Sequence, residues 1–442
     1  MTDFEAKGQA FWQWLEKNGA TLSNGIGFKD YRSEGAGRGV VATRDIKEDE
    51  ELFSIPRPLL LSVETSKLRD ALTGDDVLDK MTGWSPLILC LMYESQRDDS
   101  FWKPYFDVLP KDFSTPMFWS SDDIKELEGT DIVEKIGKKE ADEIFSQEIE
   151  PVIKNHPNLF DPAVHNLDLF HRCGSLIMAY SFHDEKDGED EENADTDKED
   201  EEDEDEEAPP KELLAMVPMA DMLNHKTGYN NARLFHESDC LRMKAIKDIR
   251  EGEQIYNTYG DLCNADLLRK YGFADENNPF DLCELNGGQV IDMFAKDDKL
   301  RDKKIEFLME EEALDDCFVV DTDHVLPDEL VSTLHVLRAS AGEFKQMERK
   351  QKLPKAQVTA PVIDMAIDIL QARLKRYPTS LDADMTELQQ NCNTNKRHAL
   401  LVRIGEKQII HNTIDKLQQE QGKRSNDDDG GSESTNKRQK TA

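Results

Sequence analysis

Hydrophobic residues near the amino terminus recur with the period of an α-helix. Spacings of seven, eight and eleven residues place four of them on one helical face: Phe4, Phe11, Trp12 and Leu15. The pattern is mostly helical again from residue 63 to residue 183, and a third time from residue 284 onward, where Pro354, Pro361 and Pro378 separate the helices. The sequence therefore predicts helices at the start, in the middle and towards the end of the chain.

Two stretches between these helical regions have the shorter period of β-strands. Residues 40–43 and 52–55 predict two strands joined by a turn into a hairpin, and short strands are predicted again between residues 217 and 259. A polar segment in each stretch has a similar order of residues, 44–50 in the first and 247–253 in the second. We expect each polar segment to turn between strands, but the similarity is too short to indicate a repeat.

A highly acidic segment interrupts the chain. Residues 184–207 contain 18 acidic residues and two lysines, so they account for −16 of the total charge of −37. Like charges repel and apolar residues are missing, so residues 184–210 are predicted to form a disordered loop. A solvated insertion is favoured over a dedicated binding segment, because surface loops tolerate added length at little cost in free energy.

These patterns predict an α+β fold, in which a β-rich core of short strands is split by a helical insertion and followed by an all-α C-terminal domain. The predicted segments are an N-terminal helix with the first part of the core (1–62), the helical insertion (63–183), the acidic loop (184–210), the second part of the core (211–283), the helical domain (284–420) and a disordered tail (421–442).

Composition excludes several classes of protein. With 92 Asp and Glu against 55 Lys and Arg, the chain is unsuited to direct nucleic-acid binding and favours basic partners such as histones or ribosomal proteins. No apolar run approaches the roughly 18 residues that span a bilayer, so no membrane association is expected, and residues 1–9 do not resemble a signal peptide. The seven cysteines are scattered and form no Cys-x-x-Cys pair, which indicates a reducing compartment and no metal site.

Three polar motifs lie at the ends of predicted strands. Taken singly, residues 35–39, with three glycines, indicate an ordinary turn, since β-branched Val40 and Val41 follow where a dinucleotide-binding turn needs a helix. The Asn224–His225 pair alone is typical of a loop or a helix cap. Tyr259, before Gly260, is by itself typical of a packed tyrosine.

In combination, the three motifs resemble the SET-domain methyltransferases. A glycine-rich turn, a helical insertion, an Asn-His pair and then Gly252-Glu253-x-Ile255-x-x-x-Tyr259-Gly260 follow one another in the family's order. The resemblance is strongest across residues 216–273, and it is closest to the subgroup named for the Rubisco large-subunit lysine methyltransferase, in particular to its fungal ribosomal-protein lysine methyltransferases. The C-terminal helical region resembles the substrate-binding domain of this subgroup.

The resemblance implies a cofactor, S-adenosyl-L-methionine, and a protein lysine as methyl acceptor. It implies that Tyr259 is the catalytic tyrosine and that no metal takes part. The cofactor would be bound by Ala36, Gly37, Arg38, Tyr180, Asn224, His225 and Tyr271. The residues that face the substrate would be Trp102, Ser181 and His183.

The substrate class implied by the fungal members is a ribosomal protein of the large subunit. The motifs alone also fit a methyltransferase acting on histones, on transcription factors or on histidine, and an acidic binding module without catalysis. Two basic clusters near the C-terminus, 423–424 and 437–440, are separated by twelve residues. This spacing suits a bipartite nuclear localisation signal, so we expect recognition by a nuclear import receptor and location in the nucleus, with a cytoplasmic fraction.

Overall fold

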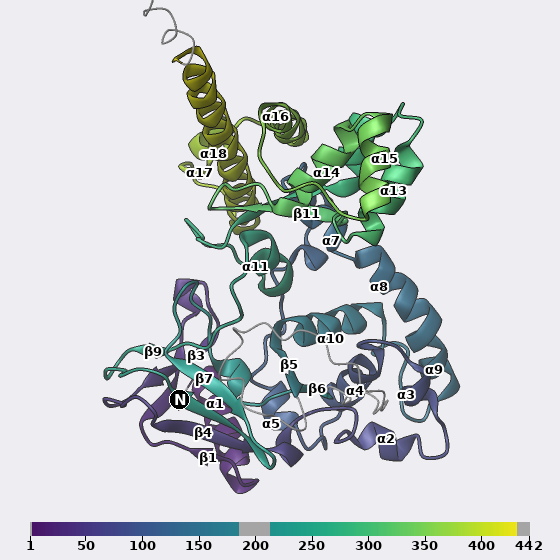
Figure 1. Ribbon diagram of the computed structural model, residues 1–442. Coiled ribbons are helices and arrows are strands. Elements are labelled where there is room, and N and C mark those ends of the chain that lie inside the picture. Colours follow the sequence, from purple (N-terminus) through teal and green to yellow (C-terminus); the bar gives the residue numbers. More distant parts are fainter. Residues whose placement is uncertain (1, 185–212, 431–442) are drawn as a thin grey trace, which may run out of the picture. The chain divides into compact units, whose positions relative to one another are not determined.

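The computed structural model describes residues 2–184 and 213–430, which form two compact units (Figure 1). Unit 1 contains residues 1–118 and 137–261, and unit 2 contains residues 119–136 and 262–442. The helical insertion is therefore shared, because residues 119–136 pack with the C-terminal region. Residues 185–212, which include nearly all of the acidic segment, lie outside the described residues, as do residues 431–442.

The strands of unit 1 form three small antiparallel sheets. One has the order β1-β4-β8-β7, one has the order β2-β3-β9, and in the third β5 pairs with β6. The strands are β1 (Thr21–Leu22), β2 (Ile26–Asp30), β3 (Arg38–Ala42), β4 (Glu51–Pro56), β5 (Ser181–Asp184), β6 (Leu213–Met216), β7 (Ala232–His236), β8 (Cys240–Ala245) and β9 (Gln254–Ile255).

The predicted hairpin of residues 40–43 and 52–55 is wrong in its pairing. Both strands exist, as β3 and β4, but they belong to different sheets. The two similar polar segments cross between these sheets, one from β3 to β4 and the other from β8 to β9. They pair with each other through Ile46 and Ile249, whose backbone N–H groups donate reciprocally at 2.8 and 2.9 Å. Both isoleucines are 1% exposed, so burial in the core holds each crossover in place.

Helix α1 (Asp3–Lys17) begins at a capping box in which Thr2 and Glu5 satisfy each other's backbone N–H groups. The predicted apolar face of α1 is confirmed, because Phe11 and Leu15 are fully buried in the core of unit 1.

The other α-helices of unit 1 are α2 (Lys67–Ala71), α3 (Val77–Lys80), α4 (Ser85–Ser95), α5 (Lys103–Phe106), α8 (Lys138–Ile144), α9 (Glu150–Asn155) and α10 (Leu167–Tyr180).

The part of unit 2 that the structure describes is helical apart from one antiparallel pair, β10 (Leu282–Asn286) with β11 (Cys317–Asp321). Its helices are α6 (Ser121–Lys125), α7 (Ile132–Lys135), α11 (Asn264–Tyr271), α12 (Gly287–Ala295), α13 (Arg301–Glu310), α14 (Asp328–Arg338), α15 (Ala341–Lys350), α16 (Ala360–Leu374), α17 (Leu381–Leu388) and α18 (Thr394–Gly430). The α+β class is confirmed, with this strand pair as an addition to the predicted all-α domain.

The boundary predicted for the tail is wrong, because α18 continues through residues 421–430. A helix that is already formed extends cheaply, since each further residue adds a hydrogen bond without a new nucleation cost. No helix among the described residues is long and apolar enough to cross a membrane.

A buried cluster of charges fastens α17 to α18. The carboxylate of Asp384 is fully buried and accepts from Arg403 Nη2 at 3.0 Å and from Lys407 Nζ at 2.6 Å. Both cations are also nearly inaccessible, at 2% and 1% exposure. Removing the carboxylate would leave the buried Lys407 without its counter-ion and Arg403 with only a longer contact to Glu126, at 3.6 Å.

We expect Asp384→Ala to destabilise unit 2 by about 3–5 kcal/mol, the scale for breaking a buried ion pair from one side. Hydrogen exchange of the α17 and α18 amides, followed by mass spectrometry, measures this loss. The matched control is Asp382→Ala, an exposed residue of the same helix, which should change stability by less than about 1 kcal/mol. Equal protection in the two variants would contradict the role given to Asp384.

Candidate active site

The glycine-rich turn leads into β3 of unit 1. A short 3-10 helix, Arg32–Glu34, ends at Gly35, whose φ of 82° lies in the left-handed region that glycine adopts without strain. The backbone N–H of Ala36 then donates to the carbonyl of Tyr31 at 3.1 Å, and the N–H of Tyr31 donates to the carbonyl of Gly37 at 2.9 Å. These two bonds fix the turn and leave open space on the Cα of Gly37.

Gly39 allows two side-chain amides to approach the backbone of β3. A Cβ atom at this position would lie 2.7 Å from Gln254 Nε2 and 2.8 Å from Asn224 Nδ2. Both amide nitrogens are buried, and neither has a hydrogen-bond partner among the described residues. A buried donor without an acceptor costs free energy, so two of them beside one turn indicate a place for a polar ligand.

The segment from Val217 to His225, which contains Asn224, has a strained backbone at one residue. Met219 has a φ of 86°, which is unfavourable for a residue with a side chain, yet it is fully buried. Asn224 then bridges to Tyr256 in parallel fashion, and its carbonyl accepts from the N–H of Asn257 at 3.2 Å. The segment after β9 is therefore tied directly to the Asn-His pair.

His225 and Tyr259 are in direct contact. The backbone N–H of Tyr259 donates to His225 Nδ1 at 3.1 Å, and the two rings stack at 5.0 Å between centroids with 19° between their planes. Because Nδ1 accepts, a neutral His225 carries its proton on Nε2. The Tyr259 hydroxyl donates to the carbonyl of Leu223 at 3.0 Å. Leu223 directly precedes Asn224, so this bond holds the hydroxyl beside the Asn-His pair.

A cleft of about 520 Å³ opens beside the glycine-rich turn, within the size range of small-molecule sites. Four of the predicted cofactor residues line it: Gly37, Arg38, Tyr180 and Asn224. Its remaining wall comes from Thr2, Asp3, Phe4, Lys7, Arg32, Asp107, Val108, Leu109, Pro110, Lys111, Asp112, Asp221 and Met222. Ala36, His225 and Tyr259 are not part of the lining. Ala36 and His225 each precede or follow a lining residue in the chain, and Tyr259 is bonded to His225 and Leu223.

The guanidinium of Arg38 packs against α1. It lies 3.6 Å from the ring centroid of Phe4, and Nη2 donates to the Phe4 carbonyl at 3.1 Å. Burial lowers the pKa of Arg38 to about 10, and its Nε and Nη1 atoms have no hydrogen-bond partner among the described residues. The resemblance implied only that Arg38 binds the cofactor, so this contact between its side chain and the N-terminal helix is an addition.

Asp221 is a residue of the cleft that the sequence reasoning passed over. Its side chain is buried and accepts a hydrogen bond from the hydroxyl of Tyr105, while Oδ1 has no partner among the described residues. Burial raises the pKa of Asp221 to about 8. A lone carboxylate within the apolar run of residues 217–223 was the signal that could have identified it.

The remaining predicted residues occupy different surroundings. Trp102 is 2% exposed and donates from Nε1 to the Leu59 carbonyl at 3.0 Å, so the structure does not bring it to a surface where a substrate could reach it. Ser181 closes α10 by donating to the Ile177 carbonyl at 2.6 Å, and His183 is exposed on β5. Tyr271 lies in unit 2 at the end of α11, where burial raises its pKa to about 12.

Comparisons with known proteins identify the family. Residues 37–260 match the SET domain family, and residues 295–410 match the family described as Rubisco LSMT substrate-binding. The N-lysine methyltransferase setd6 of Salmo salar is 32% identical, over 92% of this chain and 96% of its own. The setd6 protein of Xenopus laevis is 31% identical, over 92% of this chain and 94% of its own.

A fungal relative and a solved structure extend the comparison. Ribosomal lysine N-methyltransferase 4 of Saccharomyces cerevisiae is 36% identical, over 64% of this chain and 59% of its own, so the animal proteins match more of the chain than the fungal one favoured from the sequence. The structure of Rubisco LSMT bound to AdoMet has the same fold, with a TM-score of 0.71 at 21% identity, over 94% of this chain and 92% of that one.

The buried carboxyl of Asp221 makes stability depend on pH. Its pKa of about 8 in the folded protein lies above the ordinary value near 3.9, so the folded state holds the proton more tightly. The free energy of unfolding should therefore fall as pH rises from 4 to 8, by up to about 1.4 kcal/mol per pH unit. Asp221→Asn should remove this loss.

Urea unfolding at several pH values, followed by tryptophan fluorescence, measures the effect, because Trp12, Trp14, Trp84 and Trp102 all lie in unit 1. The matched control is Asp107→Asn, a partly exposed carboxylate of the same cleft that pairs with Lys103. Parallel pH profiles for the wild type and Asp221→Asn would refute the assignment.

Proposed function

Because the chain belongs to the SET-domain protein-lysine methyltransferases, we propose that it transfers a methyl group from S-adenosyl-L-methionine to a lysine of a large-subunit ribosomal protein. The observation that carries the proposal is the cleft at the glycine-rich turn, where Asn224 presents a buried amide without a partner among the described residues. The ribosomal substrate is supported by the printed name of the fungal relative and by the acidity of this chain.

The residues of the cleft fit the cofactor. Gly37 leaves open space beside its Cα, and Asn224 offers a donor that needs an acceptor such as the cofactor's amino-acid end. Tyr180 and Arg38 would complete the walls of the site. His225, which follows Asn224 in the chain, accepts from the backbone N–H of Tyr259 and so holds Tyr259 beside the Asn-His pair. When bound, S-adenosyl-L-methionine supplies an electrophilic methyl group on a sulfonium centre.

The protein's own contribution is alignment and control of a proton. Methyl transfer is an in-line displacement, so holding the amine in the correct direction supplies much of the rate. The acceptor lysine must be neutral, although its ordinary pKa is about 10.4. A site that excludes water and lies beside a positive charge lowers that pKa. Tyr259, held by its bonds to His225 and Leu223, would orient the amine.

We expect Tyr259→Phe to reduce the rate of methylation by about 100-fold or more, the scale for removing one preorganised polar group from a transition state. The assay uses isolated large ribosomal subunits and S-adenosyl-L-methionine with a labelled methyl group, and mass spectrometry locates the label. Tyr93→Phe, which alters a buried tyrosine of the same unit, is the matched control and should keep full activity. Absence of Tyr259-dependent label on any lysine of these subunits would refute the proposed substrate.

We further propose that the basic clusters 423–424 and 437–440 direct nuclear import. Replacing the lysines and arginines of both clusters with alanine should move a fluorescent fusion of the full chain from the nucleus to the cytoplasm. The control replaces Asn426 and Asn436 with alanine, within the same segment but outside the clusters. A fusion that stays nuclear without the clusters would show that another segment carries the signal.

A further inference from the structure

One aromatic ring at the start of α1 contacts two arginines that flank the first glycines of the glycine-rich turn. The guanidinium carbon of Arg38 lies 3.6 Å from the centroid of the Phe4 ring, and that of Arg32 lies 5.2 Å from the same centroid. Arg32 precedes the first glycine of the turn, and Arg38 precedes the last one. Phe4 therefore bridges the two ends of the segment that leads into β3.

The side chain of Arg38 depends on α1 and β2 for its position. Nη2 donates to the carbonyl of Phe4 at 3.1 Å, and the ring of Phe28, on β2, lies 5.3 Å from the guanidinium carbon. Nε and Nη1 have no hydrogen-bond partner among the described residues. Arg32 differs, because it pairs with Asp30. Arg38 is thus held mainly by aromatic rings, of which Phe4 supplies the nearer one.

Gly8 gives the guanidinium of Arg38 room to approach α1. A Cβ atom at position 8 would lie 2.6 Å from Arg38 Nη1, which is closer than real Cβ contacts. Gly8 is buried within the helix, although glycine weakens a helix relative to alanine. The packing of Arg38 against α1 therefore requires a residue without a side chain at this position.

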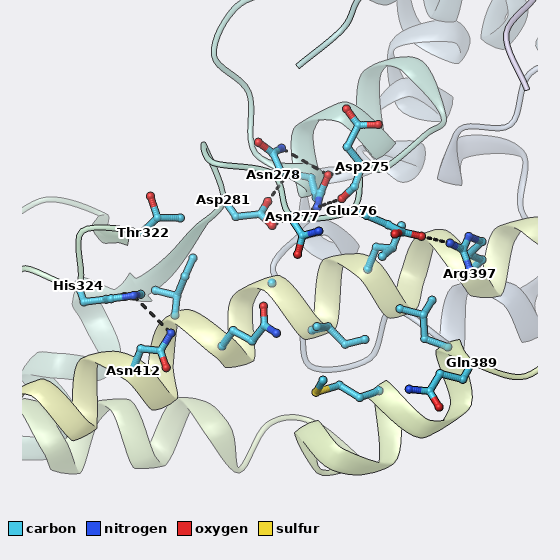
Figure 2. A pocket seen from close by; sticks show the side chains of 18 residues that line it. Asp275, Glu276, Asn277, Asn278, Asp281, Thr322, His324, Gln389, Arg397 and Asn412 are labelled. Carbon is cyan, nitrogen blue, oxygen red and sulfur yellow. Dashed lines mark hydrogen bonds and ion pairs between the residues drawn. The ribbon is translucent and has the colours of Figure 1, made fainter. Parts of the chain in front are cut away.

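The cleft of unit 2 shows a different kind of charged lining (Figure 2). In this cleft of about 460 Å³, the carboxylate of Asp281 accepts from the backbone and the side-chain amide of Asn264, and Glu276 pairs with Arg397. Polar bonds between neighbours fix these side chains. Arg38 has a single hydrogen bond among the described residues, to a backbone carbonyl, so its place depends on packing.

The first turns of α1 also form a wall of the cleft at the glycine-rich turn. This cleft of about 520 Å³ is lined by Thr2, Asp3, Phe4 and Lys7, together with Arg32, Gly37 and Arg38. The start of a helix opens at a low cost in free energy, because its first backbone N–H groups have no partner within the helix. When these turns open, the cleft loses a wall. The site is therefore complete only while Phe4 lies against the two arginines.

We propose that Phe4 is a positioning residue of the cofactor site, which holds the first turns of α1 and the glycine-rich turn in the arrangement that binds S-adenosyl-L-methionine. A ligand that binds only this arrangement loses apparent affinity in proportion to the fraction of molecules in which it is open. By linkage, the bound ligand also stabilises α1. The inference rests on the cofactor of the proposed function and is independent of the ribosomal substrate.

The first test is hydrogen exchange of the full chain, followed by mass spectrometry. The probe is S-adenosyl-L-homocysteine, the product that remains after methyl transfer. We expect saturating probe to slow exchange of the amides of residues 6–12 of α1. Binding of the probe without any change in these amides would overturn the inference alone. A wild type that does not bind the probe would overturn the cofactor of the proposed function as well.

The second test measures the affinity for the same probe by titration calorimetry. Phe4→Leu keeps an apolar side chain but removes the ring, so the dissociation constant should rise about tenfold, the scale for losing contacts to two guanidinium groups. Phe4→Tyr restores the ring and should bind like the wild type. The slower exchange of α1 with probe should be lost in Phe4→Leu and recovered in Phe4→Tyr.

Phe235→Leu is the matched control for the loss of an aromatic ring. The Phe235 ring is 36% exposed in unit 1 and lies 6.0 Å from the Arg233 guanidinium and 5.2 Å from Lys244 Nζ, but outside the lining of the cleft. This variant should bind the probe with wild-type affinity. An equal loss of affinity in Phe235→Leu and Phe4→Leu would show a general effect on unit 1 and refute the positioning role.

Gly8→Ala decides the question should Phe4→Leu fold poorly. Alanine favours the helix more than glycine does, so this change does not weaken α1 by itself. Its Cβ atom occupies the space beside Arg38 Nη1 and displaces the guanidinium from Phe4. We expect the dissociation constant for the probe to rise by a factor of about three or more. Wild-type affinity in Gly8→Ala would refute the role given to the contact between Phe4 and Arg38.

Discussion

The close approach of Asn224 to the backbone of Gly39 is the constraint on which the site depends. The amide nitrogen lies where only a residue without a Cβ atom leaves room, and Gln254 reaches the same point from β9. Because the backbone of Asn224 is also bridged to Tyr256, this residue joins the glycine-rich turn, the Asn-His pair and the segment that leads to Tyr259. Three motifs far apart in the sequence are thus held together by the close approach of one short side chain to Gly39 and by one main-chain bridge.

This arrangement has an energetic cost that a ligand can reverse. Asn224 Nδ2 and Gln254 Nε2 are buried donors without an acceptor among the described residues, and Met219 is held at a positive φ. Each such feature is worth roughly 1–3 kcal/mol. They persist because the surrounding core is tightly closed, with Ile46 and Ile249 pinning the two crossovers at 1% exposure. A cofactor that accepts from the amides would recover part of that free energy, so preorganisation and cofactor affinity have the same origin.

Local features of the fold could be predicted from the sequence, but non-local pairing could not. The buried face of α1, which contains Phe11 and Leu15, follows from the helical period of its hydrophobic residues alone. The order of the three motifs along the chain indicates their family. The partners of β3 and β4 do not follow, because strands close in sequence join different sheets and pair with β9 and β8 from the far side of the insertion. The joining of residues 119–136 to unit 2 depends on similar long-range contacts. Asp221 was missed although it is the lone carboxylate of an apolar run, because the sequence does not show that its side chain is buried beside the cleft.

The acidity of this chain bears on the class of a basic partner more than on the residue that is modified. Residues 184–207 carry −16 of the total charge of −37. Attraction between charges that are separated by salt water decays over about 8–10 Å, so it raises the rate of encounter and loses strength as salt is added. Such attraction acts on any basic protein alike. The choice of one lysine therefore depends on short-range contacts beside the cleft, where Asn224 and the Tyr259 segment are held by main-chain bonds.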